Sequence, residues 1–150
     1  MGQTLVQNYL HIVFSTKNRE PFITPEIEND LHAYLGGICN KLDCPPIKVG
    51  GHVDHVHLLV ALSKNISLMN LLKELKIASS NWIKTVDKKY KNFYWQDGYG
   101  AFSVNINDLQ KVINYISNQH KHHRKKTFRE EFLEFLQLNQ LEYDERYLWS

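Results

Sequence analysis

The sequence has few cysteines and no long hydrophobic run. Two cysteines, Cys39 and Cys44, occur among 150 residues, and no second Cys or His pair follows them at zinc-finger spacing. This argues against a structural zinc site and indicates free thiols in a reducing compartment. No apolar stretch approaches the ~20 residues of a membrane span, and the first residues lack a signal-peptide pattern. We therefore expect a cytoplasmic protein without a membrane partner.

Charge of one sign is also scarce. The chain has 18 Lys and Arg against 16 Asp and Glu, a net charge of +2, so bulk charge indicates no particular partner. The distribution is uneven, because residues 120–129 (HKHHRKKTFR) are basic and the tail beyond them is acidic. A local basic cluster can hold phosphates beside a site. It can equally be a solvated helix face, which charge alone favours.

The hydrophobic pattern predicts one α+β domain over residues 1–150, since 43% hydrophobic residues suffice for a real core. Strands are predicted over 5–15, 47–50 and 55–62, and extended segments over 93–95 and 99–104. Helices are predicted from Thr24 to shortly before Pro45, from Ser67 to Val86, from Asn107 or Asp108 to about Lys125, and over 127–138, where Thr127 and Glu130 form a capping-box pattern. The order is β-α-β-β-α-β with additional C-terminal helices, one of which carries Tyr115. This is the ferredoxin-like arrangement, an antiparallel sheet with helices on one face.

Two histidines stand two residues apart on the predicted strand 55–62. Side chains alternate between the faces of a strand, so His55 and His57 project from the same side while Val56 points into the core. Two adjacent imidazoles can hold one divalent ion. They can also simply face solvent, but titratable rings on an otherwise apolar strand are costly without partners.

Tyr115 and Gln119 lie one helical turn apart and therefore share a face. Taken alone, this spacing is typical of an amphipathic helix with a tyrosine at its edge. Combined with the histidines it indicates a phosphoryl-transfer site, because three protein ligands leave open metal positions for a phosphate oxygen. A cation beside the phenol, whose ordinary pKa is about 10, favours the reactive phenolate.

Four stretches of the chain resemble one known family. They are YLHIVFSTKNREPF (9–22), GGHVDHVHLLVAL (50–62), WQDGYGAFSVN (95–105) and YISNQHKHH (115–123), and together they span about residues 5–125. In this order they are similar to the single-tyrosine HUH transposases of bacterial insertion sequences, which include the REP-associated tyrosine transposases. The letters HUH denote His, a bulky apolar residue and His, which His55, Val56 and His57 match.

The resemblance implies a ferredoxin-like DNA transposase, a metal-dependent enzyme that cleaves and rejoins single-stranded DNA. Tyr115 would form a 5′-phosphotyrosine intermediate, and His55, His57 and Gln119 would hold Mg²⁺ or Mn²⁺. Ligand chemistry alone leaves the ion open, since imidazoles also suit zinc, copper, iron and nickel. Family members are homodimers with merged sheets, in which the tyrosine helix of one subunit can complete the site of the other. Their substrates are DNA hairpins near element ends.

Further side chains are candidates for DNA contact. Trp95, Tyr99 and Phe102 can stack on unpaired bases, although Phe102 is at least as compatible with a core position. Asp54 can orient a ligand ring, although a loop-capping role is at least as compatible with its position. The candidates for binding the DNA backbone are Lys17, Arg19, Lys121, His122, Arg124 and Lys125.

The resemblance leaves an alternative function open: a domesticated relative that binds hairpin DNA without transposition. Tyr115→Phe distinguishes the two functions, since binding survives this change and covalent capture does not. A two-histidine phosphoesterase is disfavoured because the chain lacks a second H-x-[ST] pair.

Overall fold

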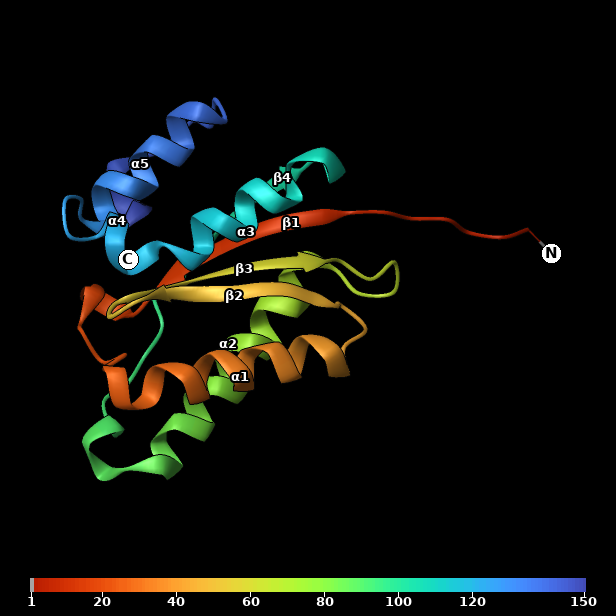
Figure 1. The fold of residues 1–150 in the computed structure, drawn as a ribbon. Coiled ribbons are helices and arrows are strands. Elements are labelled where there is room, and N and C mark those ends of the chain that lie inside the picture. Colours follow the sequence, from red (N-terminus) through yellow and green to blue (C-terminus); the bar gives the residue numbers. More distant parts are fainter. Residues whose placement is uncertain (1) are drawn as a thin grey trace.

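The computed structural model describes residues 2–150 and contains a four-stranded antiparallel sheet in the order β2-β3-β1-β4 (Figure 1). Its strands are β1 (Tyr9–Ser15), β2 (Pro46–His52), β3 (His55–Ala61) and β4 (Gly100–Val104). Strand β3 lies between β2 and β1, so it is central in the sheet, as its apolar sequence requires. The predicted ferredoxin-like α+β fold is confirmed.

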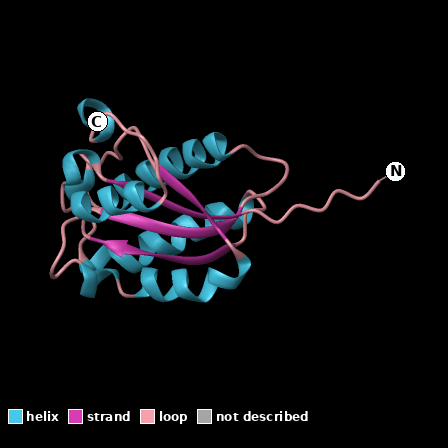
Figure 2. Cartoon of the chain, turned by 90° about the horizontal axis from the view of Figure 1, so that it is seen from above, coloured by secondary structure: helices cyan, strands magenta, loops and turns pink. Residues whose placement is uncertain are grey.

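Helices cover both faces of the sheet (Figures 1 and 2). One layer contains α1 (Pro25–Lys41) and α2 (Leu68–Val86), which connect the strands. On the other face lie α3 (Leu109–Ser117), α4 (Gln119–His122) and α5 (Phe128–Leu138), followed near the C-terminus by α6 (Glu145–Leu148). The second face is therefore covered by the C-terminal helices, including the one that carries Tyr115.

Alternation along the strands separates a main core from a smaller one. On β3, Val56, Leu58 and Val60 are fully buried against α1 and α2. Each such aliphatic side chain stabilises the fold by about 1.5–3 kcal/mol. On the opposite face, a smaller apolar cluster joins the sheet to α5; it consists of Val13, Phe102, Phe128, Phe132 and Leu136. The histidines of β3 point toward this second face.

Strand β1 starts later than the sequence pattern predicted, at Tyr9 instead of residue 5. Tyr9 is already opposite Ala61, the last residue of β3, and Val104, the last residue of β4. Residues 5–8 have no strand to pair with, and they extend away from the sheet (Figure 1) with Leu5 80% exposed. Residues 93–95 likewise form no strand, only an isolated bridge between Trp95 and Thr16.

The helix predicted to run to about Lys125 is broken at Asn118. This residue has φ −104° and ψ 19° and separates α3 from α4. Its side-chain amide donates to the Asn114 carbonyl at 2.8 Å, which replaces a helical hydrogen bond and favours the break. Among the other predicted caps, Ser67 accepts from the Asn70 amide and Thr127 forms a capping box with Glu130. Thr24 and Asp108 occupy the N-cap positions of α1 and α3 without a side-chain cap hydrogen bond.

Helix α3 lies unusually close to β2, and Gly50 permits the approach. A Cβ atom added at Gly50 would lie 2.6 Å from Ile116 Cγ2 and 2.9 Å from the Ile116 carbonyl oxygen. Only glycine leaves room for this packing. Since Ile116 follows Tyr115 directly, Gly50 helps to set how near the tyrosine lies to the sheet.

Two expectations from composition can be compared with the structure. Cys39 and Cys44 are free, as predicted, and both are buried. Among residues 2–150, no helix has both the length and the apolar character needed to cross a membrane.

Candidate active site

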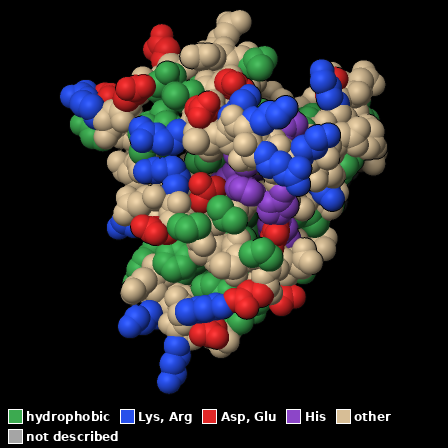
Figure 3. Space-filling view, turned by 60° about the vertical axis from the view of Figure 1, so that its left-hand side comes forward, with side chains coloured by type: hydrophobic (Ala, Val, Ile, Leu, Met, Phe, Trp, Pro, Cys, Tyr) green, Lys and Arg blue, Asp and Glu red, His purple; other side chains and the backbone are tan. Residues whose placement is uncertain are grey.

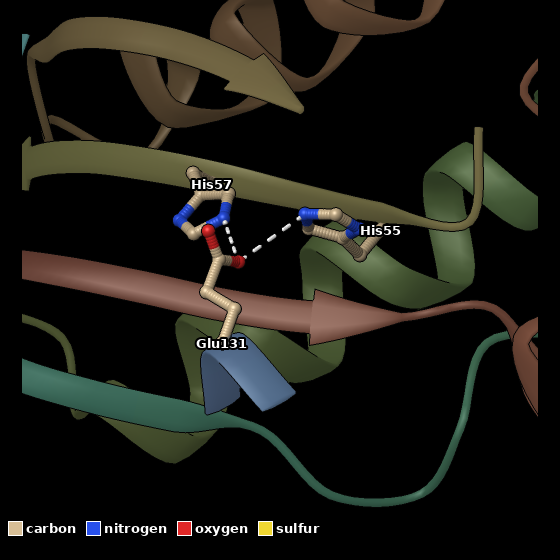
Figure 4. A group of neighbouring side chains, drawn as sticks. All are labelled: His55, His57 and Glu131. Atoms are coloured by element: carbon tan, nitrogen blue, oxygen red, sulfur yellow. Dashed lines mark hydrogen bonds and ion pairs between the residues drawn. The ribbon is translucent and has the colours of Figure 1, made fainter. Parts of the chain in front are cut away.

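The two histidines of β3 point to the same face of the sheet, as their spacing predicted. Both are 0% exposed, and they lie opposite Ser15 and Val13 of β1. Their Nε2 atoms converge on one carboxylate oxygen, Glu131 Oε1, at 3.4 Å from His55 and 2.9 Å from His57 (Figure 4). The imidazoles therefore share a partner instead of facing solvent.

The outer ring nitrogens of both histidines have partners as well. His55 Nδ1 donates to Asp54 Oδ1 at 2.7 Å, and His57 Nδ1 lies 2.7 Å from His11 Nε2. Such partners fix the orientation of an imidazole and leave its Nε2 atom available to a metal. Asp54 was anticipated in this role, whereas His11 was not. The available signal for His11 was a histidine on an apolar strand, in register with the inward face.

Tyr115 and Gln119 join the histidines from the second layer. Gln119 is buried, and its Oε1 atom lies 2.8 Å from His55 Nε2. Tyr115 lies in the last turn of α3, and its hydroxyl donates to Glu131 Oε2. Although the helix breaks between them, the four residues predicted from sequence meet within one chain.

Glu131 on α5 is the residue that sequence reasoning missed. It is 1% exposed, and its carboxylate contacts His55, His57, Tyr115, Gln119 and His123. The sequence carried a signal, because this glutamate shares a helix face with Phe128, Phe132 and Phe135. A charged residue within an apolar stripe is rarely buried without a partner.

The buried charges of this cluster shift one another. Burial alone lowers the pKa of His55, but hydrogen bonds to Asp54 and Glu131 outweigh it and raise the pKa to about 9. Burial lowers the pKa of His57 to about 4, with Glu131 offsetting only part of the effect. For Glu131, burial is outweighed by hydrogen bonds from His123, His55 and His57, so its pKa lies far below the usual range. Burial and the Glu131 charge raise the pKa of Tyr115 well above its usual value.

The donor set suits a divalent cation. One ligand atom from each of His55, His57 and Glu131 lies within 4.8 Å of the other two, and Gln119 Oε1 is beside them. Two imidazole nitrogens with amide and carboxylate oxygens can accept first-row metals as well as Mg²⁺. The partnered Nδ1 atoms, described above, are what a metal-binding histidine needs.

The candidate DNA contacts fall into two groups. Lys121, His122 and Lys125 line a pocket next to Tyr115, whose ring stacks on His122 with centroids 4.8 Å apart. Arg124 lines an adjoining pocket. Figure 3 shows histidine side chains gathered on the surface with lysine and arginine side chains beside them. This half of the predicted interface surrounds the tyrosine.

Lys17 and Arg19 form the second group, on a short turn after β1. Arg19 lies over the Trp149 ring, 5.6 Å from its centroid, and Lys17 lines a different pocket from that of Tyr115. Trp95 and Phe102 are 7% and 5% exposed, so they are core residues and unsuited to base stacking. Tyr99 remains 38% exposed.

Comparison with known proteins decides the family. A family model described as "Transposase IS200 like" matches residues 4–119, most of the chain. The chain belongs to this family. The matched region runs from before β1 to Gln119 and includes both histidines of β3 and Tyr115. Glu131 and α5 lie beyond it.

Individual relatives agree with this assignment. The ISDra2 transposase TnpA of Deinococcus radiodurans is 24% identical over 115 residues, which are 73% of this chain and 82% of that protein. A solved structure assigned as a transposase of Deinococcus radiodurans R1 has a TM-score of 0.63 at 21% identity and covers 79% of this chain and 96% of the other. A REP-associated tyrosine transposase solved with a REP hairpin has a TM-score of 0.61 at 13% identity, covering 82% and 73%. At these identities the two structures establish the shared fold, and the resemblance to tyrosine transposases is confirmed.

Proposed function

We propose that this IS200-like transposase cleaves and rejoins single-stranded DNA at hairpin-marked element ends through a 5′-phosphotyrosine intermediate. Tyr115 is the nucleophile, and His55, His57 and Gln119 hold the cation, Mg²⁺ or Mn²⁺. The proposal rests on the convergence of the nucleophile and the metal-binding histidines. The phenol oxygen of Tyr115 and the Nε2 atoms of both histidines meet at a single buried carboxylate.

A divalent cation bound here would neutralise phosphate charge and polarise the phosphorus. The protein orients the metal-binding imidazoles and the nucleophile. Asp54 and His11 contact the Nδ1 atoms of His55 and His57 and so fix the two imidazoles. Helix α3 places Tyr115 above them, from the helical layer on this face of the sheet. The hydrogen bond to Glu131 fixes the phenol oxygen at the edge of the donor set. Such positioning supplies a large part of the rate in phosphoryl transfer.

The proposed reaction forms one phosphorus–oxygen bond for each one that it breaks. Tyr115 Oη loses its proton and forms a bond to the phosphorus, while the bond from phosphorus to the 3′ oxygen breaks. The leaving 3′ oxygen takes up a proton, so the proton count is unchanged. One phosphodiester is exchanged for another, and a 3′ hydroxyl can reverse the step on a different end. No external energy source is needed for cutting followed by rejoining.

The basic side chains beside Tyr115 are the proposed binding site for the DNA backbone. Lys121, His122, Arg124 and Lys125 are placed to bind phosphates flanking the scissile bond. Lys17 and Arg19, away from this pocket, would bind a more distant part of the strand. A hairpin as substrate is supported by the REP-associated relative, which was solved with one.

We further propose a homodimer with a shared sheet. Strand β4 pairs with β1 on one side, and among residues 2–150 no strand pairs with its other side. An edge strand of this kind can continue the sheet into a second copy. Because Tyr115 already meets the histidines of its own chain, each subunit could also act without a composite site. Light scattering after size exclusion should give the mass of two chains.

A covalent-capture assay tests the function. A hairpin oligonucleotide labelled at its 3′ end is incubated with protein and Mn²⁺, because the protein should remain on the 5′ end of the downstream fragment. We expect a labelled band that survives denaturing electrophoresis and disappears with chelator. Tyr115→Phe should abolish it while retaining hairpin binding, as should His57→Ala.

Tyr34→Phe is the matched control, since Tyr34 lies on α1 across the sheet, stacked on Trp82. It should form the adduct at the wild-type rate. An adduct that persists in Tyr115→Phe would refute the nucleophile. Hairpin binding by the wild type without any adduct would instead establish the domesticated, binding-only alternative.

A further inference from the structure

We propose that Glu131 is a fourth ligand of the cation and at the same time positions the nucleophile, with one carboxylate oxygen for each task. Oε1 binds the ion together with the histidines, and Oε2 holds the Tyr115 hydroxyl. The inference rests on the proposed function, and it assigns a role to a residue outside the region that the family model matches.

The two oxygens of Glu131 have different surroundings. Oε1 faces the metal-binding nitrogens, 2.9 Å from His57 Nε2 and 3.4 Å from His55 Nε2 (Figure 4). Oε2 accepts hydrogen bonds from the Tyr115 hydroxyl and from Gln119 Nε2, the latter at 3.0 Å. A carboxylate shared in this way would link the ion to the nucleophile through three atoms.

Glu131 also sets the orientation of Gln119. Because the Gln119 amide nitrogen donates to Oε2, its carbonyl oxygen is turned toward His55 Nε2, at 2.8 Å. His123 supports the same orientation, with its Nε2 atom 3.0 Å from that carbonyl oxygen. The amide therefore presents the atom that a cation requires. Without Glu131, the Gln119 amide nitrogen would lose its acceptor, and only the His123 contact would favour this orientation.

The structure holds this carboxylate in place at a considerable cost. A buried charge is unfavourable unless it is paired and hydrogen-bonded, and an apolar residue at this position would match its neighbours on α5. The helix is anchored around it by Phe132, which packs on Gly100, and by Phe128, which stacks on the His55 ring at 4.5 Å. The capping box at Thr127 fixes where the helix starts. Helix α5 thus serves to carry Glu131 into the site.

Four protein ligands would determine which ion is useful. A tetrahedral ion such as Zn²⁺ would be saturated by two imidazoles, an amide and a carboxylate, leaving no position for phosphate. An octahedral ion such as Mg²⁺ or Mn²⁺ would keep two positions for phosphate oxygen and water. We therefore expect Zn²⁺ to displace Mn²⁺ from the protein and to block adduct formation.

The experiment measures metal binding directly. Free Mn²⁺ is titrated by electron paramagnetic resonance with wild type, Glu131→Gln, His57→Ala and the charge control Glu74→Gln, which is exposed on α2 across the sheet. Removing the carboxylate charge should raise the Mn²⁺ Kd on the order of 10- to 100-fold, and the control should leave it unchanged. Equal affinity in Glu131→Gln and wild type would overturn the inference.

These variants distinguish a wrong role for Glu131 from a wrong metal site. If His57→Ala loses Mn²⁺ and Glu131→Gln does not, the metal site stands and the role of Glu131 is wrong. If neither variant changes the affinity, the proposed metal site itself is wrong.

Two further readouts separate ligation from support of the fold. With 3-fluorotyrosine incorporated, Mg²⁺ should shift the ¹⁹F resonance of residue 115 in wild type, and no shift would overturn the coupling of the tyrosine to the ion. Crystals soaked in Mn²⁺ should place the ion about 2 Å from Glu131 Oε1. An ion on the histidines and Gln119 with Glu131 turned away would overturn the ligand assignment, whether or not Glu131→Gln folds.

Discussion

Replacing Gly50 with alanine should separate the nucleophile from the histidines. The added methyl carbon would lie 2.6 Å from Ile116 Cγ2 and 2.9 Å from the Ile116 carbonyl oxygen, about 1 Å short of an ordinary carbon contact of 3.5–4.0 Å. The carbonyl belongs to the backbone of α3 and cannot rotate away. Helix α3 must therefore shift by about that amount, and Tyr115 must shift with it.

The expected magnitudes follow from this shortfall. Overpacking of this kind costs about 1–3 kcal/mol, which corresponds to a fall in Tm of roughly 2–4 °C for each kcal/mol in a chain of this size. A misplacement of about 1 Å at a reacting group can slow the chemical step about 100-fold. Thermal unfolding and single-turnover adduct formation with the 3′-labelled hairpin measure the two effects separately.

Gly37→Ala is the matched control. Gly37 lies in α1, and an added Cβ would meet nothing within 4 Å. Because glycine in a helix interior costs about 0.5–1 kcal/mol relative to alanine, this variant should be slightly more stable and equally active. If Gly50→Ala melted at the wild-type temperature and formed the adduct at the wild-type rate, the close packing of α3 on β2 would be refuted.

Two other predictions concern the carboxylate behind His55 and the cysteines of the main core. Asp54→Asn removes the charge that holds the outer nitrogen of His55, so Mn²⁺ affinity should fall about tenfold or more; an unchanged Mn²⁺ Kd would show that Asp54 has no part in orienting the ligand. Cys39 is buried in the main core, and burial raises its pKa to about 12; with Cys44 also buried, neither thiol should react with Ellman's reagent at pH 8 until denaturant is added. Rapid titration of either thiol in the folded protein would contradict the packing described.

Local patterns were sufficient for most of the fold. Strict alternation around Val56 predicted both the core face of β3 and the direction of its two histidines. The caps at Ser67 and Thr127 were readable because each depends on contacts only three residues apart. The start of β1 could not be predicted locally, because a strand begins and ends where its neighbours do. Its limiting neighbours, Ala61 and Val104, are far away in the sequence.

The site was predictable only as far as short spacings and a family resemblance reach. His55 and His57 lie two residues apart, and Tyr115 and Gln119 lie four apart, so each pair could be placed on one face. Glu131 meets them only because α5 folds back over the sheet, an arrangement that no local pattern encodes. His11 was missed for a related reason, since its partner His57 lies on a neighbouring strand 46 residues away.

Mapping the covalent bond tests the assignment of Tyr115 as nucleophile most directly. After reaction with a DNA hairpin and Mn²⁺, the protein is treated with nuclease and trypsin, and the peptides are sequenced by mass spectrometry. Cleavage after Lys111 and Lys121 releases a peptide that contains a single tyrosine, Tyr115. We predict a 5′-linked nucleotide on that tyrosine, formed only when the cation is present. A nucleotide on any other residue, or one formed equally well with chelator, would contradict it.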